Sequence, residues 1–166
     1  MRVHLTTVRP LTADERRRLT YVESSAQSPW ALRDAVILAL LLESGLRASE
    51  LCAITLEAVS DADDKRLAIT VRGTKIRGRR LLLSPETSAL VRDYVRRERN
   101  RRSSHEELLF YGDAIPLDVQ GVHAIVRTAG ERAGIAEPLT VHRLRQTALS
   151  DAWTASRKAQ GAEEDR

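Results

Sequence analysis

An uninterrupted apolar stretch, AVILALLL at residues 35–42, is the strongest constraint on how this chain can fold. It is too short to span a bilayer, which takes about 20 apolar residues, and we predict that it lies in a helix over residues 30–44. Gly45, which suits the end of a helix, follows directly. A helix that is apolar on every face must be covered on all sides. The other elements of the domain are therefore expected to pack around it.

The rest of the sequence predicts further helices and one β-hairpin. Thr12 and Glu15 form a capping box at the start of a first helix, and Ser84-Pro85-Glu86 is typical of another helix start. The expected helices cover residues 12–24, 46–51, 84–95, 117–134 and a last segment from residue 140, and the expected strands cover residues 66–72 and 79–83. These elements indicate an α+β fold that is mainly helical, with a small antiparallel β-sheet.

Three further expectations concern individual helices and the C-terminal tail. The basic run RRERNRR at residues 96–102 is typical of a solvated helix end, with phosphate contact as the alternative. The polar tail from Ser156 is expected to fray. The last helix should direct a set of apolar side chains into the core, namely Leu144, Ala148, Leu149 and Ala152.

The length and the net charge of the chain limit the number of domains and the class of binding partner. The 166 residues suit one domain, which we place at residues 11–156, between an N-terminal tail at residues 1–10 and a polar C-terminal tail at residues 157–166. The net charge is +4, and most of the basic residues are arginines. This balance favours an anionic partner such as nucleic acid, although a basic enzyme of another class has the same composition.

Several chemistries are missing from the sequence. The one cysteine, Cys52, excludes an internal disulfide, and the start of the chain has no apolar signal-peptide core, so a cytoplasmic protein without a membrane segment is expected. None of the four histidines stands at metal-ligand spacing from another ligand, and we expect neither a metal ion nor an organic cofactor. Glycine-rich phosphate loops, dinucleotide fingerprints and the nucleophile elbow of serine hydrolases are also absent.

Near the end of the chain, His142 and Arg145 stand three residues apart in the segment TVHRLRQT. In a helix this spacing places both side chains on one face. An arginine fork binds two oxygens of an anionic group, and an imidazole exchanges a proton near neutral pH, so the pair suits a phosphate. A surface arginine beside a half-buried histidine on an amphipathic helix explains the same spacing.

Two other stretches supply partners for that pair. Arg47 follows the apolar helix and has Glu50 as its expected local partner; a purely structural ion pair is the alternative. The turn of the hairpin carries Lys75 and Arg77, with Arg79 close behind. Cations in such a turn also serve simply to keep a sheet edge soluble.

These stretches resemble the sequence boxes of the tyrosine recombinases, the family of the phage integrases. Residues 42–51, LESGLRASEL, resemble the family's T-G-L-R-x-S-E-L box. Residues 142–147, HRLRQT, resemble its H-x-L-R-H-T box, with Gln146 in place of the second histidine. The basic hairpin lies between the two boxes, as in that family, and the resemblance extends over residues 11–152.

The resemblance implies a mostly helical catalytic domain that forms part of a clamp around double-stranded DNA. In the family, a tyrosine attacks the scissile phosphate, forms a 3′-phosphotyrosyl link and releases a 5′-hydroxyl, without a metal ion or a nucleotide. Carried over, Arg47 and Arg145 bind the phosphate, His142 acts there in proton transfer or hydrogen bonding, and Lys75 is the general acid for the leaving hydroxyl. The remaining implied roles are orientation of Arg47 by Glu50 and DNA contacts by Arg77, Arg79 and Arg143.

The resemblance also indicates what this sequence lacks. The family's nucleophilic tyrosine follows the H-x-x-R helix, whereas the three tyrosines here, Tyr21, Tyr94 and Tyr111, all precede it. We therefore expect a DNA-binding recombinase fragment that is truncated before its nucleophile and inactive alone. The alternatives are a non-catalytic regulator or assembly partner of recombinase protomers, and a decayed remnant of a mobile element.

Overall fold

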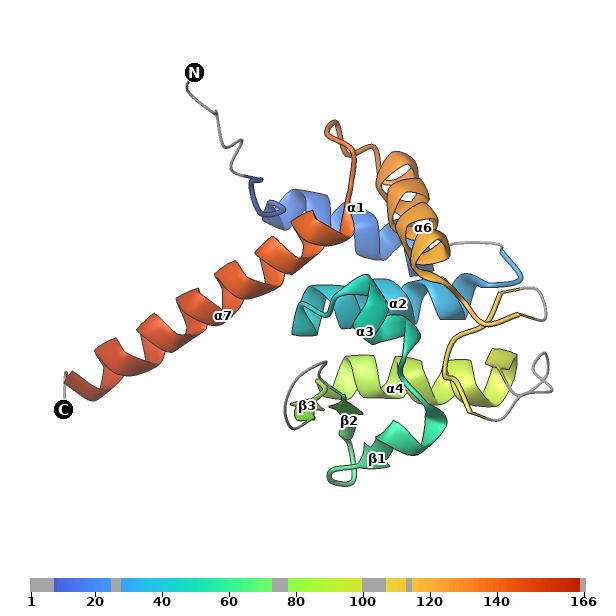
Figure 1. The fold of residues 1–166 in the computed structure, drawn as a ribbon. Helices are drawn as coiled ribbons and strands as arrows, with labels where there is room; N and C mark the ends of the chain where they lie inside the picture. Colours follow the sequence, from blue (N-terminus) through green and yellow to red (C-terminus); the bar gives the residue numbers. More distant parts are fainter. Residues whose placement is uncertain (1–7, 25–27, 73–77, 100–106, 113–114, 165–166) are drawn as a thin grey trace, which may run out of the picture.

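The computed structural model describes residues 8–24, 28–72, 78–99, 107–112 and 115–164. In chain order its elements are α1 (Ala13–Ser24), α2 (Ala31–Ser44), α3 (Ala48–Cys52), η1 (Leu56–Ala58), β1 (Val59–Asp61), β2 (Leu67–Val71), β3 (Arg79–Leu82), α4 (Pro85–Tyr94), η2 (Val95–Arg99), α6 (Val119–Arg132) and α7 (Val141–Glu164). Figure 1 shows the helices gathered around α2, with the short strands at one end and α7 extending away from the body. The predicted fold class, mainly helical with a small antiparallel sheet, is confirmed.

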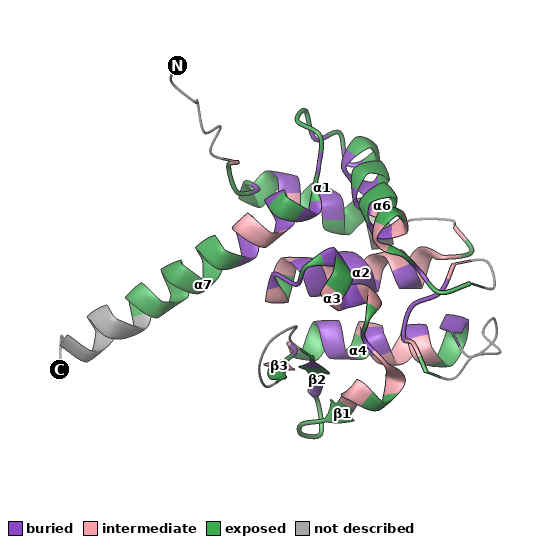
Figure 2. Ribbon diagram, in the orientation of Figure 1, coloured by how far each residue is buried: buried purple, intermediate pink, exposed green. Residues whose placement is uncertain are grey.

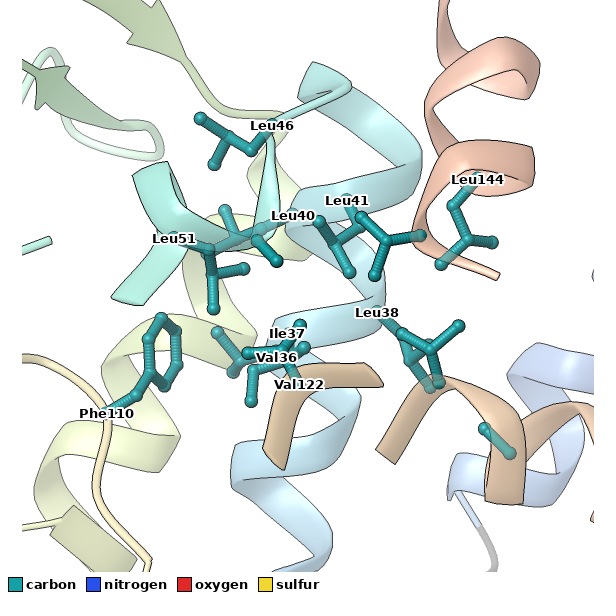
Figure 3. Packing of buried hydrophobic residues seen from close by; sticks show 14 of the residues in the cluster. Val36, Ile37, Leu38, Leu40, Leu41, Leu46, Leu51, Phe110, Val122 and Leu144 are labelled. Atoms are coloured by element: carbon teal, nitrogen blue, oxygen red, sulfur yellow. The ribbon is translucent and has the colours of Figure 1, made fainter. Parts of the chain in front are cut away.

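Helix α2 is the centre of the core, as its sequence predicts. Val36, Ile37, Leu40 and Leu41 are fully buried, and α1, α4, α6 and α7 all pack against the helix. Burial of each such side chain stabilises the fold by about 2 kcal/mol, so the packing on α2 fixes where its neighbours lie. Figure 3 shows apolar residues from the surrounding elements around this helix, namely Leu46, Leu51, Phe110, Val122 and Leu144.

The three strands form one antiparallel sheet in the order β1-β2-β3. Strands β2 and β3 are the predicted hairpin, and their register places Val71 opposite Arg79. Strand β1, which pairs Val59 with Ile69 of β2, was not predicted, because a strand of three residues is too short to show an alternating pattern. The turn of the hairpin, residues 73–77, lies outside the described residues.

The basic run after α4 matches the predicted solvated helix end only in part: Arg96 and Arg97 are exposed, whereas residues 100–102 lie outside the described residues. In η2, Glu98 and Arg99 are buried. The Glu98 carboxylate accepts the backbone N–H groups of Leu32 and Arg33 at 3.1 and 3.3 Å, which supplies partners for the open N-terminal end of α2. Arg99 Nη2 donates to the carbonyl of Leu108 at 2.9 Å. These two side chains are therefore bound within the protein rather than presented to solvent.

Helix α7 is longer and less buried than predicted. Its first turns pack on α2 through Leu144 and Ala148, but Leu149 and Ala152, which were expected to face the core, are exposed. The helix then leaves the body and continues to Glu164, where the sequence predicted a frayed tail; the alanine, lysine, arginine and glutamate residues there are good helix formers. Figure 2 shows that α7 is exposed where it leaves the body, over residues 149–158. Among the described helices, none combines the length and the apolar character needed to cross a membrane.

Candidate functional site

The two sequence boxes meet where α2 ends and α7 begins. Gly45 closes α2 in the left-handed backbone conformation, with φ of 60°, which glycine adopts without a Cβ penalty. Its carbonyl accepts a hydrogen bond from Arg145 Nη1 at 2.6 Å. A Cβ atom added at Gly45 would lie only 3.3 Å from Cβ of Ala148, so the two backbones approach closely. This contact places Arg145 beside the segment that carries Arg47.

Arg47 immediately precedes α3 and is exposed. Its backbone N–H donates to Glu50 Oε2 at 2.8 Å, whereas its guanidinium has no hydrogen bond or ion pair within the described part of the chain. The ion pair between Arg47 and Glu50, which was the purely structural alternative for these residues, is therefore not formed within the described part of the chain. Arg47 is the N-cap of α3, and the backbone N–H of an N-cap residue points at the side chain of the third helical residue, here Glu50. The guanidinium that pairs with the Glu50 carboxylate is that of Arg79 in β3, at 3.1 Å. Glu50 thus ties the Arg47 backbone to the hairpin and leaves the Arg47 guanidinium available to an anion.

His142 lies in the first turn of α7 and is exposed. The helix begins after Thr140, as predicted, because the Thr140 hydroxyl accepts the N–H of Arg143 at 3.1 Å. His142 and Arg145 are three positions apart and share a face of the helix. Neither side chain pairs with a carboxylate among the residues that the structure describes. Arg145 and Arg47 thus lie at the junction of α2 and α7, and His142 shares the helix face of Arg145.

Arg143 does not occupy the surface position that its predicted DNA contact requires. Its side chain is 2% exposed, and Nη2 binds both carboxylate oxygens of Glu15, at 3.0 and 3.1 Å. Arg9 binds the same carboxylate at 2.7 and 2.8 Å. Hydrogen bonds from Arg9, from the Thr12 backbone and from Arg143 hold the pKa of Glu15 well below its ordinary value, although burial opposes this shift. A guanidinium buried and paired in this way cannot contact DNA, so the structure contradicts the prediction.

Three other predicted residues belong to the β2–β3 hairpin. Lys75 and Arg77 lie outside the described residues, and their roles stay predictions. Arg79, at the start of β3, has a side chain that is 45% exposed and paired with Glu50. This pairing leaves Arg79 able to exchange partners, because ion pairs between exposed groups are weak. The pair also brings the base of the hairpin next to Arg47.

The arrangement suits an anion rather than a metal ion. Within the ranges that the structure describes, no group of three or more His, Cys, Asp or Glu side chains is placed to hold a metal. A hollow of about 360 Å³ between α1, α2 and α4 is lined mainly by apolar side chains, and the described residues around it include Glu86 but no basic residue. That hollow is not an anion site, and the basic set at the start of α7 remains the candidate.

The sequence matches the Phage integrase family over residues 9–157. Tyrosine recombinase XerC of Brucella suis is 41% identical to this chain over 71 residues, which are 42% of this chain and 22% of that protein. Tyrosine recombinase XerC of Chromohalobacter salexigens is 28% identical over 157 residues, which are 94% of this chain and 51% of that protein. The chain thus spans about half the length of the relative that it matches over nearly all of its own sequence.

Solved structures share the fold. The crystal structure of XerA recombinase superposes with a TM-score of 0.72 at 25% identity and covers 84% of this chain and 48% of that one. The XerH site-specific recombinase, bound to its difH substrate in a pre-cleavage complex, superposes with a TM-score of 0.76 at 16% identity, over 88% of this chain and 43% of that one. At the latter identity the likeness concerns the fold alone.

Proposed function

This chain belongs to the phage integrase family of tyrosine recombinases, and on that premise we propose that it binds double-stranded DNA as part of a site-specific recombinase. In this proposal Arg47, His142 and Arg145 contact the scissile phosphate. The observation that carries it is the hydrogen bond from Arg145 to the Gly45 carbonyl, which joins the two basic boxes. Arg47 and His142 keep their side chains without a partner among the described residues.

The chemistry of these groups fits a phosphodiester. Two guanidinium forks present pairs of N–H donors to the non-bridging oxygens, whose negative charge rises as the phosphorus becomes five-coordinate. His142, on the same helix face as Arg145, donates a hydrogen bond or transfers a proton there, and Lys75 supplies the proton to the leaving hydroxyl. Glu50 acts indirectly, because its carboxylate fixes the backbone of Arg47.

We further propose that residues 1–166 do not cleave DNA on their own. A tyrosine nucleophile has to reach the phosphorus atom. Tyr94 is buried, its hydroxyl donates to the carbonyl of Leu109 at 2.9 Å, and burial raises the pKa of Tyr94 above its ordinary value. Tyr111 is also buried, and Tyr21 lies in the last turn of α1, next to Val22, whose carbonyl accepts a hydrogen bond from Arg132 of α6. These placements support a phosphate-binding site whose nucleophile comes from outside these residues.

Salt-dependent binding to duplex DNA is the expected result of the proposed function. Arg47→Ala and Arg145→Ala should each weaken binding about tenfold, because a charge-assisted hydrogen bond contributes roughly 1.5–3 kcal/mol and the low end applies to side chains in contact with solvent. Each should also make the plot of log affinity against log salt concentration less steep, by about one unit of slope. Fluorescence anisotropy with a duplex of about 30 base pairs, titrated between about 50 and 200 mM salt, measures both quantities.

Arg96→Ala is the matched control for these two variants. Arg96 lies in η2, at the far end of α4 from the hairpin (Figure 1), and pairs with Asp93 at 2.8 Å. Its removal should change the affinity by less than about twofold. Absence of binding at low salt, or equal losses for all three variants, would contradict the proposal. With nicked suicide duplexes, a phosphotyrosyl adduct on a denaturing gel would show that these residues cleave DNA alone.

One observation favours a second candidate function, a non-catalytic partner of recombinase protomers. On α7, Leu149 and Trp153 are 51% and 67% exposed, and their spacing places them on one helix face. An uncovered apolar stripe of this kind suits contact with another protein. Added to a full-length relative acting on its own site, the chain should change the recombination rate by more than about threefold, and Trp153→Ala should abolish that change. An unchanged rate would rule this candidate out.

A further inference from the structure

Arg143, although next to His142 in the sequence, is buried and binds three separate segments of the chain. Its Nη2 binds Glu15 on α1, its Nε donates to the carbonyl of Arg9 at 3.2 Å, and its Nη1 donates to the carbonyl of Glu137 at 3.4 Å. A planar guanidinium has its donors in a fixed geometry. With partners on all three of its nitrogens, this side chain is held in one orientation.

A second contact joins the segment before α1 to the same helix. The backbone N–H of Leu11 donates to Thr147 Oγ1 at 2.9 Å, and that hydroxyl donates to the Arg143 carbonyl at 2.8 Å. Thr147 is fully buried. The first turns of α7 are therefore bonded to the segment before α1 at two positions, one helical turn apart.

These bonds decide how the start of α7 is rotated about its own axis. Successive residues of an α-helix are about 100° apart, so a turn that directs Arg143 into the core directs His142 and Arg145 toward the other side. A rotation by one position would carry Arg145 away from the Gly45 carbonyl, to which it donates at 2.6 Å. The buried contacts of Arg143 and the directions of the His142 and Arg145 side chains are thus coupled.

We propose that Arg143 is a positioning residue, which acts through Glu15 and the segment before α1 to set the orientation in which His142 and Arg145 bind a DNA phosphate. The inference rests on the proposed function for the identity of the anion. It also assigns Arg9 to the support of the site, because Arg9 binds the second side of the Glu15 carboxylate.

A double-mutant cycle on the full chain tests this role. Arg143→Met removes the buried charge and leaves Glu15 paired with Arg9. We expect this variant to bind a duplex of about 30 base pairs roughly fivefold more weakly. When Arg145→Ala is added to Arg143→Met, the affinity for DNA should fall by less than about twofold further, because Arg145 is already misdirected. In the unmodified chain the same substitution should lower the affinity about tenfold. A purely structural role would lower the unfolding midpoint but leave the tenfold effect of Arg145→Ala intact, which would overturn the proposal.

Arg16→Met is the matched control. Arg16 also joins α1 to α7, through an ion pair with Asp151, but this pair lies more than a turn beyond Arg145. It is therefore a second arginine between the same two helices that does not hold the first turn of α7. In the Arg16→Met background, Arg145→Ala should keep its effect of about tenfold. A reduced effect in this background too would contradict a specific role for Arg143.

The ¹⁵N chemical shift of the Leu46 amide reports the orientation without DNA. This amide shares a peptide group with the Gly45 carbonyl that Arg145 binds. Arg143→Met should move the signal toward its position in Arg145→Ala, and Arg16→Met should leave it in place. If the unmodified chain fails to bind DNA but the signal moves as expected, the proposed function is wrong and the positioning of Arg145 by Arg143 stands. If DNA binds and the signal is unmoved in Arg143→Met, the positioning role is wrong.

A second variant keeps the test decisive if Arg143→Met unfolds. Arg143→Lys retains the charge opposite Glu15, but a single ammonium group cannot reproduce the planar fork that spans a carboxylate and two carbonyls. The same shift of the Leu46 signal and the same reduced effect of Arg145→Ala are expected. An unmoved signal together with an undiminished Arg145→Ala effect in Arg143→Lys would overturn the proposal.

Discussion

Glu15→Ala is expected to lower the free energy of unfolding by about 3 kcal/mol, because it leaves the buried Arg143 guanidinium without its carboxylate. The side chains of Arg143 and Glu15 are 2% and 6% exposed, so water cannot replace the lost partner. The same carboxylate accepts the Thr12 N–H at the start of α1. Breaking a buried ion pair costs about 3–5 kcal/mol, and we expect the low end here because the Arg143 guanidinium keeps two backbone carbonyl acceptors. Urea unfolding followed by circular dichroism measures it.

Glu137→Ala is the control, because Glu137 pairs with the same two arginines from an exposed position. Its carboxylate lies 3.6 Å from Arg9 and 3.7 Å from Arg143, and its side chain is 59% exposed. Its removal should lower the free energy of unfolding by less than about 1 kcal/mol. Similar losses for the two glutamates would contradict the view that burial makes the Glu15 pair strong.

The Glu15 carboxylate also makes the stability depend on pH. Hydrogen bonds from Arg9, from the Thr12 backbone and from Arg143 hold its pKa in the folded state below the ordinary value of 4.5. Its contribution is therefore complete above about pH 4.5 and is lost as the pH falls further, since the unfolded chain takes up the proton first. Below about pH 4.5 the unmodified chain should lose stability more steeply than Glu15→Gln. Parallel curves for the two proteins would contradict this assignment.

Local rules explain why much of the fold was predictable. The central place of α2 follows from an apolar stretch with no polar face, and the left-handed Gly45 follows from its position after that stretch. The caps at Thr12 and Ser84 form as predicted, with the side-chain oxygens accepting the N–H groups of Glu15 and Thr87. Each of these features depends on residues only a few positions apart, which a single sequence displays directly.

Partners distant in the sequence explain most of what was missed. The buried Arg143 pairs with Glu15, which is 128 positions away in the sequence. Glu98 accepts the backbone N–H of Leu32 at the start of α2, 66 positions away. No spacing in the sequence marks such pairs, so arginines on a helix look alike whether they face the core or the solvent. The ion pair between Arg47 and Glu50 does not form although the two residues are close in sequence, because the Glu50 carboxylate accepts the backbone N–H of Arg47 and binds the side chain of Arg79.

Gly45→Val is expected to lower the free energy of unfolding by about 3 kcal/mol, because it strains the junction between α2 and α7. A residue with a side chain in the left-handed region is disfavoured by roughly 1–2 kcal/mol, and Gly45 has φ of 60°. The added Cβ would also lie 3.3 Å from Cβ of Ala148, and overpacking of this kind adds about 1–2 kcal/mol. Urea unfolding measures the total.

Gly134→Val separates the two contributions. Gly134 follows α6 with φ of 62°, but among the described residues a Cβ there would meet only the end of the flexible Arg18 side chain, at 3.4 Å. This variant should therefore show the backbone strain alone, about 1–2 kcal/mol. Ala148→Gly by itself costs a helix about 1 kcal/mol, so it should cost less in the Gly45→Val background, where it also relieves the close contact, than in the Gly134→Val background. Equal losses for the two valine variants would contradict a tight contact between α2 and α7.

The same junction links this stability prediction to DNA binding. The Gly45 carbonyl is the acceptor that holds Arg145, and Arg47 follows two residues later. If the two boxes act as one phosphate site, Gly45→Val should weaken DNA binding about tenfold, as much as Arg145→Ala, under conditions where the variant is still folded. Gly134→Val, which strains a helix end away from the site, should leave the affinity unchanged. An affinity that survives Gly45→Val would mean that Arg47 and Arg145 bind DNA independently, and the proposed shared phosphate site would then be wrong.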